Sequence, residues 1–194
     1  MKITKIDAAR QLVSRWSGGT TTQLAICPAE AVYADHDFLW RISSAVVELP
    51  ESDFTPLPDY DRILLILEGE LSLSHDGGEE YTLRALEQTS FDGASQTFSR
   101  GQVTDFNLMM RKGRCAGRVE PRELREGETW QKDASNQYAD ALLFCVDGNA
   151  EIVCGDKTEL LAKGEALLLE DAGAVVCRAA CATATVILAE MGLK

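Results

Sequence analysis

The stretch that decides the fold class is Arg62-Ile63-Leu64-Leu65-Ile66-Leu67-Glu68-Gly69-Glu70-Leu71-Ser72-Leu73-Ser74. Five apolar residues run into an acid-glycine-acid turn, and leucine and serine then alternate. An apolar run that ends at a glycine-containing turn and continues with period-two alternation is typical of a tight β-hairpin. We therefore predict two paired antiparallel strands in this segment.

The same pattern returns in the second half of the chain. It is Leu142-Leu143-Phe144-Cys145-Val146-Asp147-Gly148-Asn149-Ala150-Glu151-Ile152-Val153-Cys154, again an apolar run, an acid-glycine-polar turn and a strand. Gly69 and Gly148 lie 79 positions apart, and the two segments align without a gap. We interpret the chain as one β-module used twice.

Short strand patterns separated by glycine-containing turns fill both halves, and helical periodicity is scarce. This organisation favours an all-β protein built either as two barrels or as a sandwich. The glycine- and arginine-rich segment 112–118 is the expected connection, which divides the chain into residues 1–114 and 115–194. This division leaves room for the N-terminal strand to cross from one barrel to the other.

Composition and charge exclude several classes of partner. The net charge is −12 and there is no run of Lys or Arg, whereas a nucleic-acid-binding surface needs a clustered basic face. No apolar run approaches the roughly 18 residues of a membrane-spanning helix, so we expect no membrane association. Residues 1–7 lack the apolar core of a signal peptide, which predicts a cytoplasmic protein.

The segment Trp16-Ser17-Gly18-Gly19-Thr20-Thr21-Thr22 permits two interpretations. Two glycines after a tryptophan mark a tight loop, and three threonines suit a strand. In the first interpretation the segment is a bend into an edge strand, and Trp16 fills the core. In the second, the glycine backbone and the threonine hydroxyls line a ligand site. The residues alone favour the first.

Two later strand patterns gather polar side chains on one face. Side chains alternate faces along a strand, so Arg41 and Ser43 share one side of the strand expected at 38–49. In the segment 101–111 one face carries Asp105, Asn107, Met109 and Arg111. Such a row fits either the solvent side of a half-buried strand or the lining of a cavity.

Seven short motifs, in this order, resemble the HutD/Ves family. They are Trp16-Ser17-Gly18-Gly19-Thr20-Thr21-Thr22-Gln23-Leu24, Trp40-Arg41-Ile42-Ser43, Phe54 with Pro58, Asp61-Arg62-Ile63-Leu64, Leu67-Glu68-Gly69, Phe91-Asp92-Gly93 and Asp105-Phe106-Asn107-Leu108-Met109-Met110-Arg111. The resemblance covers residues 10–111. It implies a bicupin, which has two jelly-roll-type β-barrels in one chain, and a small-molecule pocket in the N-terminal barrel. It also implies a binding or regulatory role, linked in some members to histidine degradation, with no established reaction.

Metal-dependent cupin enzymes bind their metal through several histidines and a glutamate, the ligands that first-row metals favour. This chain has two histidines, His36 and His75, and neither has a histidine partner two residues away. We therefore predict a metal-free protein without a cofactor. No nucleophile elbow, phosphate-binding loop or dinucleotide fingerprint assigns a catalytic residue.

Arginine suits a carboxylate ligand because its planar guanidinium donates paired, charge-assisted hydrogen bonds. Arg62 aligns with Ala141 of the second copy, so we expect one ligand-binding barrel and one structural barrel. In the N-terminal pocket, arginines would fix the anion of a small carboxylate or amide metabolite, an amide and a hydroxyl would orient it, and an indole would form an apolar wall. The predicted ligand-binding residues are Trp16, Thr21, Arg41, Ser43, Arg62, Asp105, Asn107 and Arg111.

Three alternatives stay open. A buried arginine–aspartate pair would satisfy itself without any ligand. A metal-independent isomerase or amide hydrolase would use Asp105 as its general acid or base. A structural or partner-binding module would bind no small molecule. In each case, open β-edges make a homodimer the default expectation.

Overall fold

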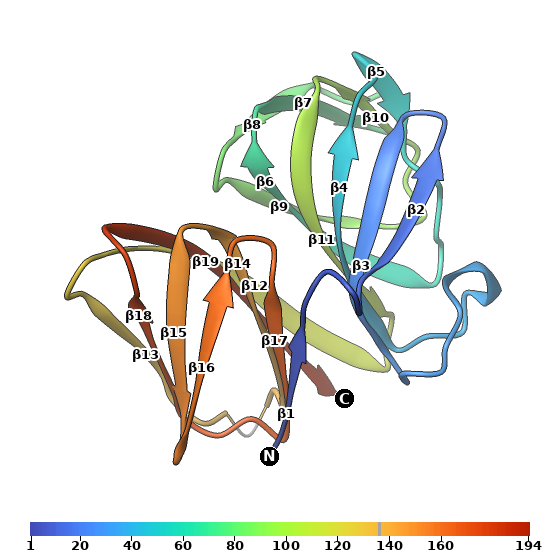
Figure 1. Cartoon of the computed structure of the whole chain (residues 1–194). Coiled ribbons are helices and arrows are strands. Elements are labelled where there is room, and N and C mark those ends of the chain that lie inside the picture. The colour runs from blue at the N-terminus through green and yellow to red at the C-terminus, as the bar shows by residue number, and fades with distance from the viewer. Residues whose placement is uncertain (136) are drawn as a thin grey trace. The chain divides into compact units, whose positions relative to one another are not determined.

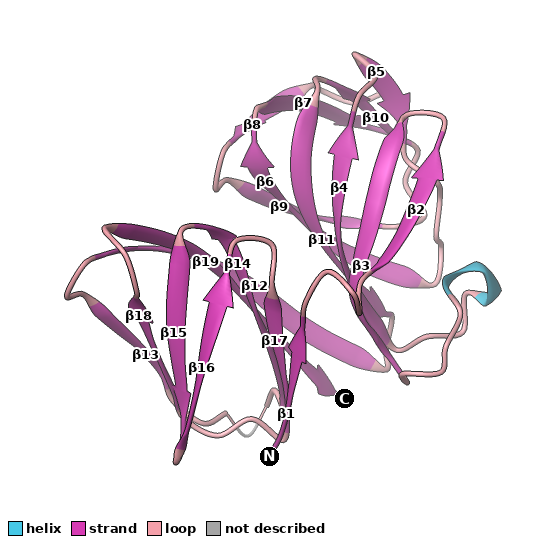
Figure 2. Ribbon diagram, viewed as in Figure 1, coloured by secondary structure: helices cyan, strands magenta, loops and turns pink. Residues whose placement is uncertain are grey.

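The structure of the chain is a computed structural model that describes residues 1–135 and 137–194. It confirms the all-β prediction, because the described residues form nineteen strands and a single 3-10 turn, η1 (Tyr33–Asp35). Figure 2 shows how little helix interrupts the strands. No helix in the described part of the chain is long and apolar enough to cross a membrane.

The chain forms two compact units, Leu12–Cys115 and Met1–Gln11 together with Ala116–Lys194. The sequence predicted a division at residue 114 and allowed the N-terminal strand to cross into the other half, and β1 (Lys2–Ile6) does pair with β17 (Ala166–Glu170) along its whole length. The first eleven residues therefore lie with the C-terminal unit. Alternation in residues 2–6 is too short to reveal a partner some 160 positions away.

The N-terminal unit contains two sheets (Figure 1). The larger has the order β2-β3-β4-β11-β6-β9 and the smaller β5-β10-β7-β8. The strands are β2 (Leu12–Trp16), β3 (Gly19–Cys27), β4 (Trp40–Val47), β5 (Glu51–Asp53), β6 (Tyr60–Glu68), β7 (Glu70–His75), β8 (Tyr81–Arg84), β9 (Gln88–Asp92), β10 (Thr97–Arg100) and β11 (Val103–Arg111).

The C-terminal unit repeats this arrangement. Its sheets have the orders β1-β17-β14-β19-β12 and β13-β18-β15-β16, so β12 to β19 match β4 to β11 strand for strand. The predicted repeat is thus present in the topology. The strands are β12 (Cys115–Arg125), β13 (Thr129–Lys132), β14 (Asp140–Asp147), β15 (Asn149–Cys154), β16 (Lys157–Ala162), β17, β18 (Val175–Ala179) and β19 (Thr183–Leu193).

The sheets do not close into the predicted barrels. Closure requires the first and last strands of a sheet to pair, but β2 pairs only with β3, and β9 pairs only with β6. Each unit is therefore a pair of open sheets, which corrects the barrel part of the fold prediction.

The predicted hairpin is also wrong in one respect. β6 and β7 are joined at Gly69, but β6 pairs with β9 and β11, whereas β7 pairs with β8 and β10. The turn carries the chain from one sheet to the other. Gly69 has φ +91°, and a Cβ there would lie 2.7 Å from the Gln102 carbonyl oxygen, so only glycine fits this corner. β14 and β15 are related in the same way through Gly148.

Candidate functional site

The N-terminal unit contains a cavity of about 560 Å³, within the size range of small-molecule sites. β4, β6 and β11 supply its buried polar side chains, β2, β3 and β5 line one side, and Tyr33 of η1 also reaches it. The lining residues are Ser14, Trp16, Ser17, Thr21, Tyr33, Arg41, Ser43, Ala45, Val47, Leu49, Ser52, Asp53, Phe54, Thr55, Arg62, Asp105, Asn107 and Met109.

Seven of the eight predicted ligand-binding residues line this cavity, Arg111 being the exception. Alternation places them there: Arg41 and Ser43 stand opposite Met109 and Asn107 in the β4–β11 register. Trp16 does not fill the core as the favoured interpretation held, because it is 38% exposed. Its indole covers Gly18, where a Cβ would fall within 2.0 Å of the ring.

Arg62 is a buried cation without a polar partner. The residue is 6% exposed, its Nε has no hydrogen-bond acceptor, and the described residues offer its guanidinium no ion pair. The guanidinium carbon instead lies 4.9 Å and 5.2 Å from the ring centres of Phe54 and Phe91. Burial lowers the pKa of Arg62 to about 10, so the side chain remains charged at neutral pH. Arg62 therefore brings a positive charge to the cavity lining that no described carboxylate pairs with.

Arg41 is held more firmly. Its Nε donates a 2.8 Å hydrogen bond to Gln23 Oε1, its Nη1 a 3.3 Å bond to Ser43 Oγ, and its guanidinium lies 4.2 Å from the Tyr33 ring centre. Burial lowers the pKa of Arg41. These neutral contacts orient the guanidinium but leave its charge unbalanced.

Asp105 is a buried carboxyl at 5% exposure. Burial raises its pKa to about 7, against the opposing effects of the Arg62 charge and of the Ala45 backbone N–H. No ion pair of the described residues joins Asp105 to Arg41 or Arg62. The self-satisfied arginine–aspartate pair that the sequence left open is therefore not formed.

Asn107 completes the polar lining. It is 5% exposed, and its Oδ1 has no hydrogen-bond partner. Buried polar atoms are nearly always paired, but Arg62 Nε and Asn107 Oδ1 have no partner among the described residues. The other two such atoms, Arg122 Nε and Glu190 Oε1, lie in the C-terminal unit.

Arg111 has a different role from the predicted one. Its Nε donates a 3.1 Å hydrogen bond to the Phe38 carbonyl, and its Nη2 donates to the His36 carbonyl and to Tyr60 Oη. Tyr60 Oη in turn donates to the same two carbonyls. Arg111 therefore holds the segment before β4 in place and does not line the cavity.

Sequence reasoning missed Gln23, Tyr33 and Phe54 as parts of the site. Gln23 and Phe54 stood in the family motifs without an assigned role, and η1 has no periodicity that predicts its side-chain directions. Each acts on an arginine: Gln23 and Tyr33 contact Arg41, and Phe54 contacts Arg62.

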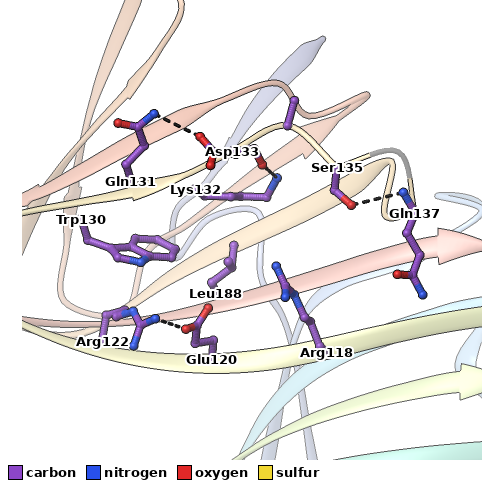
Figure 3. A pocket seen from close by; sticks show the side chains of 11 residues that line it. Arg118, Glu120, Arg122, Trp130, Gln131, Lys132, Asp133, Ser135, Gln137 and Leu188 are labelled. Atoms are coloured by element: carbon purple, nitrogen blue, oxygen red, sulfur yellow. Dashed lines mark hydrogen bonds and ion pairs between the residues drawn. The ribbon is translucent and has the colours of Figure 1, made fainter.

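The C-terminal unit has a second cavity, of about 600 Å³, shown in Figure 3. Its charged side chains pair with one another: Arg122 with Glu120, Arg118 with Glu190, and Lys132 with Glu190 at 3.1 Å. Arg122 also lies 5.4 Å from the Trp130 ring centre. The cations Arg118, Arg122 and Lys132 each have a carboxylate partner here, unlike Arg41 and Arg62, although Arg122 Nε and Glu190 Oε1 lack a hydrogen-bond partner. Among the described residues, no group of three or more His, Cys, Asp or Glu side chains could hold a metal ion.

The fold is similar to that of cupin-like proteins. A cupin 2 conserved barrel domain protein from Leptotrichia buccalis superposes with a TM-score of 0.61 at 12% identity, over 99% of this chain and 98% of that one. A conserved protein of unknown function from Pseudomonas aeruginosa PAO1 superposes with a TM-score of 0.84 at 24% identity, over 98% and 99%. HutD from Pseudomonas fluorescens SBW25 gives 0.78 at 21% identity, over the full length of both chains.

The family follows from the sequence comparison. The HutD family model matches residues 8–187, and the chain belongs to the HutD family, as the seven motifs predicted. The protein Ves of Cronobacter sakazakii is 30% identical over 120 residues, which is 58% of this chain and 63% of that protein.

Proposed function

We propose that this HutD-family chain is a metal-free protein whose N-terminal unit binds a small carboxylate-bearing metabolite. The observation that carries the proposal is Arg62, a buried charged guanidinium with no polar partner among the described residues. A buried charge without a partner is costly, and a ligand carboxylate would remove that cost through charge-assisted hydrogen bonds.

Other groups support the same ligand class. Arg41 provides a second cation, Thr21 and Asn107 offer hydrogen bonds, and the Trp16 indole provides an apolar surface. The structure of the related HutD from Pseudomonas fluorescens was determined in a formate condition, which makes formate a natural first probe. A regulatory role in histidine catabolism is the physiological part of the proposal, and it rests on family membership alone.

Thermal denaturation with formate, glutarate and benzoate tests the binding. A ligand at about a hundred times its Kd stabilises a protein by roughly 2.7 kcal/mol, or about 5–10 °C for a chain of this size. We expect the shift in the wild type and its loss in Arg62→Met. Arg118→Met is the matched control, because Arg118 is a cation of the other cavity, and the shift should persist. Loss of the shift in both variants, or in neither, would contradict the assignment of the ligand to the N-terminal cavity.

A second candidate function, a metal-independent isomerase or amide hydrolase, is favoured by Asp105, whose pKa near 7 suits a general acid or base. Turnover of small amides that disappears in Asp105→Asn would establish it. A protein that neither shifts nor turns over any probe would instead be a partner-binding module.

Location and assembly complete the proposal. All six cysteines are free thiols, which supports a reducing compartment such as the cytoplasm. β2 is an edge strand with Leu12 and Val13 exposed, which supports a homodimer. Light scattering on a sizing column measures the assembly.

A further inference from the structure

The proposed anion site contains a buried carboxyl group, that of Asp105. Its negative charge would repel a carboxylate ligand. Asp105 lies on β11, opposite Ala45 of β4 and Ile66 of β6. The charged and titratable groups lining the same cavity are Arg41 from β4, Arg62 from β6, Asp53 from β5 and Tyr33 from η1. Only Asp105, Arg41 and Arg62 among them are buried charged groups.

The ligand and Asp105 would compete for the charge of Arg62. Where protein atoms replace much of the water, like charges repel strongly over a few ångströms. A carboxylate ligand bound at Arg62 therefore raises the pKa of Asp105 further, by adding a negative charge and by excluding water. Because that pKa is already about 7 in the free protein, the added repulsion acts within the physiological pH range.

We propose that the cavity takes up its carboxylate ligand together with one proton, which Asp105 holds as a neutral carboxylic acid. The proton comes from solvent and forms an O–H bond on the Asp105 carboxylate. No bond of the ligand changes. Two arginines then face one ligand carboxylate, and the neutral acid can donate a hydrogen bond where the carboxylate would repel. The inference rests on the proposed function and adds its regulation, since affinity becomes dependent on pH.

Asp53 supplies a matched comparison. It also lines the cavity, but it is exposed, so water screens its charge. Asp105 and Asp53 thus line one cavity but differ in burial, and only the pKa of Asp105 should respond strongly to the ligand.

Isothermal titration calorimetry with benzoate and glutarate, both fully ionised between about pH 6.5 and 8.5, tests the coupling. We expect wild-type affinity to be roughly five- to twentyfold weaker at the upper end of that range. In buffers of different ionisation enthalpy, binding near pH 7.5 should take up about 0.5–0.8 proton. Asp105→Asn, which mimics the neutral acid, should bind with little pH dependence and no proton uptake. Asp53→Asn should keep the wild-type profile.

The outcomes separate the two proposals. Failure of every acid to bind at any pH contradicts the binding function itself. Binding with constant affinity and no proton uptake keeps that function and overturns the coupling. A wild-type pH profile that survives in Asp105→Asn also overturns it, because another group then takes the proton. The buffer measurement needs only the wild type, so a variant that folds poorly does not remove the test.

Discussion

The N-terminal and C-terminal units share their strand order but fill equivalent positions of their interiors differently. In β11, Asp105 pairs with Ile66 and Asn107 with Leu64. In β19, Val186 pairs with Cys145 and Leu188 with Leu143. Ile66 and Leu64 align with Cys145 and Leu143 at the repeat distance of 79 residues. The positions of Asp105 and Asn107 are therefore Val186 and Leu188 in the second copy.

The cations differ in the same way. Arg62 pairs with Met109, and its equivalent Ala141 pairs with Glu190. The C-terminal unit does contain buried charge, but Glu190 lies against Lys132 and Arg118. The amount of buried charge therefore does not separate the two cavities. What separates them is that Arg62 has no ion pair among the described residues, whereas Lys132 and Arg118 have one in Glu190.

Exchanging side chains between equivalent positions gives the largest expected effect. Leu188 is 1% exposed, belongs to the core cluster and also lines the C-terminal cavity. Leu188→Asn should lower the free energy of unfolding by about 3–5 kcal/mol through lost apolar burial and an unpaired amide. The reverse change, Asn107→Leu, removes an unpaired atom beside a cavity with room, and should change stability by less than about 1 kcal/mol. Urea denaturation of both variants measures the contrast. Equal costs would mean that both interiors are packed alike.

Glu190→Gln tests the paired charges. The amide would leave buried Lys132 without its counter-charge, and breaking such a pair typically costs about 3–5 kcal/mol. We expect about 2–4 kcal/mol, because Arg118 is 57% exposed and partly solvated. Asp147→Asn is the control, since the pair of Asp147 with Lys163 lies in solvent, and it should leave the stability almost unchanged. If Glu190→Gln lowered the free energy of unfolding as little as Asp147→Asn does, the ion pairs of Glu190 would contribute no more than a surface pair.

Much of this contrast was accessible from the sequence. Period-two alternation placed Arg41 with Ser43, and Asp105 with Asn107, on one face of their strands, but left open whether that face meets solvent or a cavity. The offset of 79 residues placed Ala141 at the position of Arg62. These inferences hold because side-chain direction in a strand depends on local geometry. They need no knowledge of the partner strand.

The sequence failed where long-range partners decide the outcome. An apolar run, a glycine turn and an alternating run fit a hairpin and a corner between sheets equally well, so Gly69 was misinterpreted. Arg111 continues the alternation of its strand, but the carbonyls of residues 36 and 38 capture its guanidinium. The pairing of Lys132 with Glu190 joins residues 58 positions apart, and no local pattern reveals it.

Because the C-terminal unit has Val186 at the position of Asp105, the pH dependence of the free energy of unfolding gives a further test of the difference between the units. Folding raises the pKa of Asp105 from 3.8 to about 7, so between these values the folded protein holds a proton that the unfolded chain releases. Stability from this group is complete below about pH 4 and is lost as the pH rises to about 7. We expect the wild type to lose roughly 3–4 kcal/mol over this interval relative to Asp105→Asn. Calorimetric Tm values across the range measure it. Parallel curves for the two proteins would show that Asp105 is not desolvated.

The end of β11 offers the smallest effect and a direct test of the corrected role of Arg111. Since Met109 and Glu190 are equivalent, Arg111 corresponds to Gly192, where a Cβ would lie 2.1 Å from the Gln137 carbonyl oxygen. In the N-terminal unit a guanidinium thus holds the segment before β4, whereas in the C-terminal unit the backbone at Gly192 packs directly against the backbone at Gln137.

Arg111→Lys keeps the charge but loses the forked geometry, so it should cost about 1–2 kcal/mol of stability and leave carboxylate affinity unchanged. Arg62→Lys is the matched change inside the cavity, and there the affinity should fall. If Arg111→Lys weakened binding at unchanged stability, the guanidinium would reach the ligand after all, and the alternation of β11 would have predicted its role correctly.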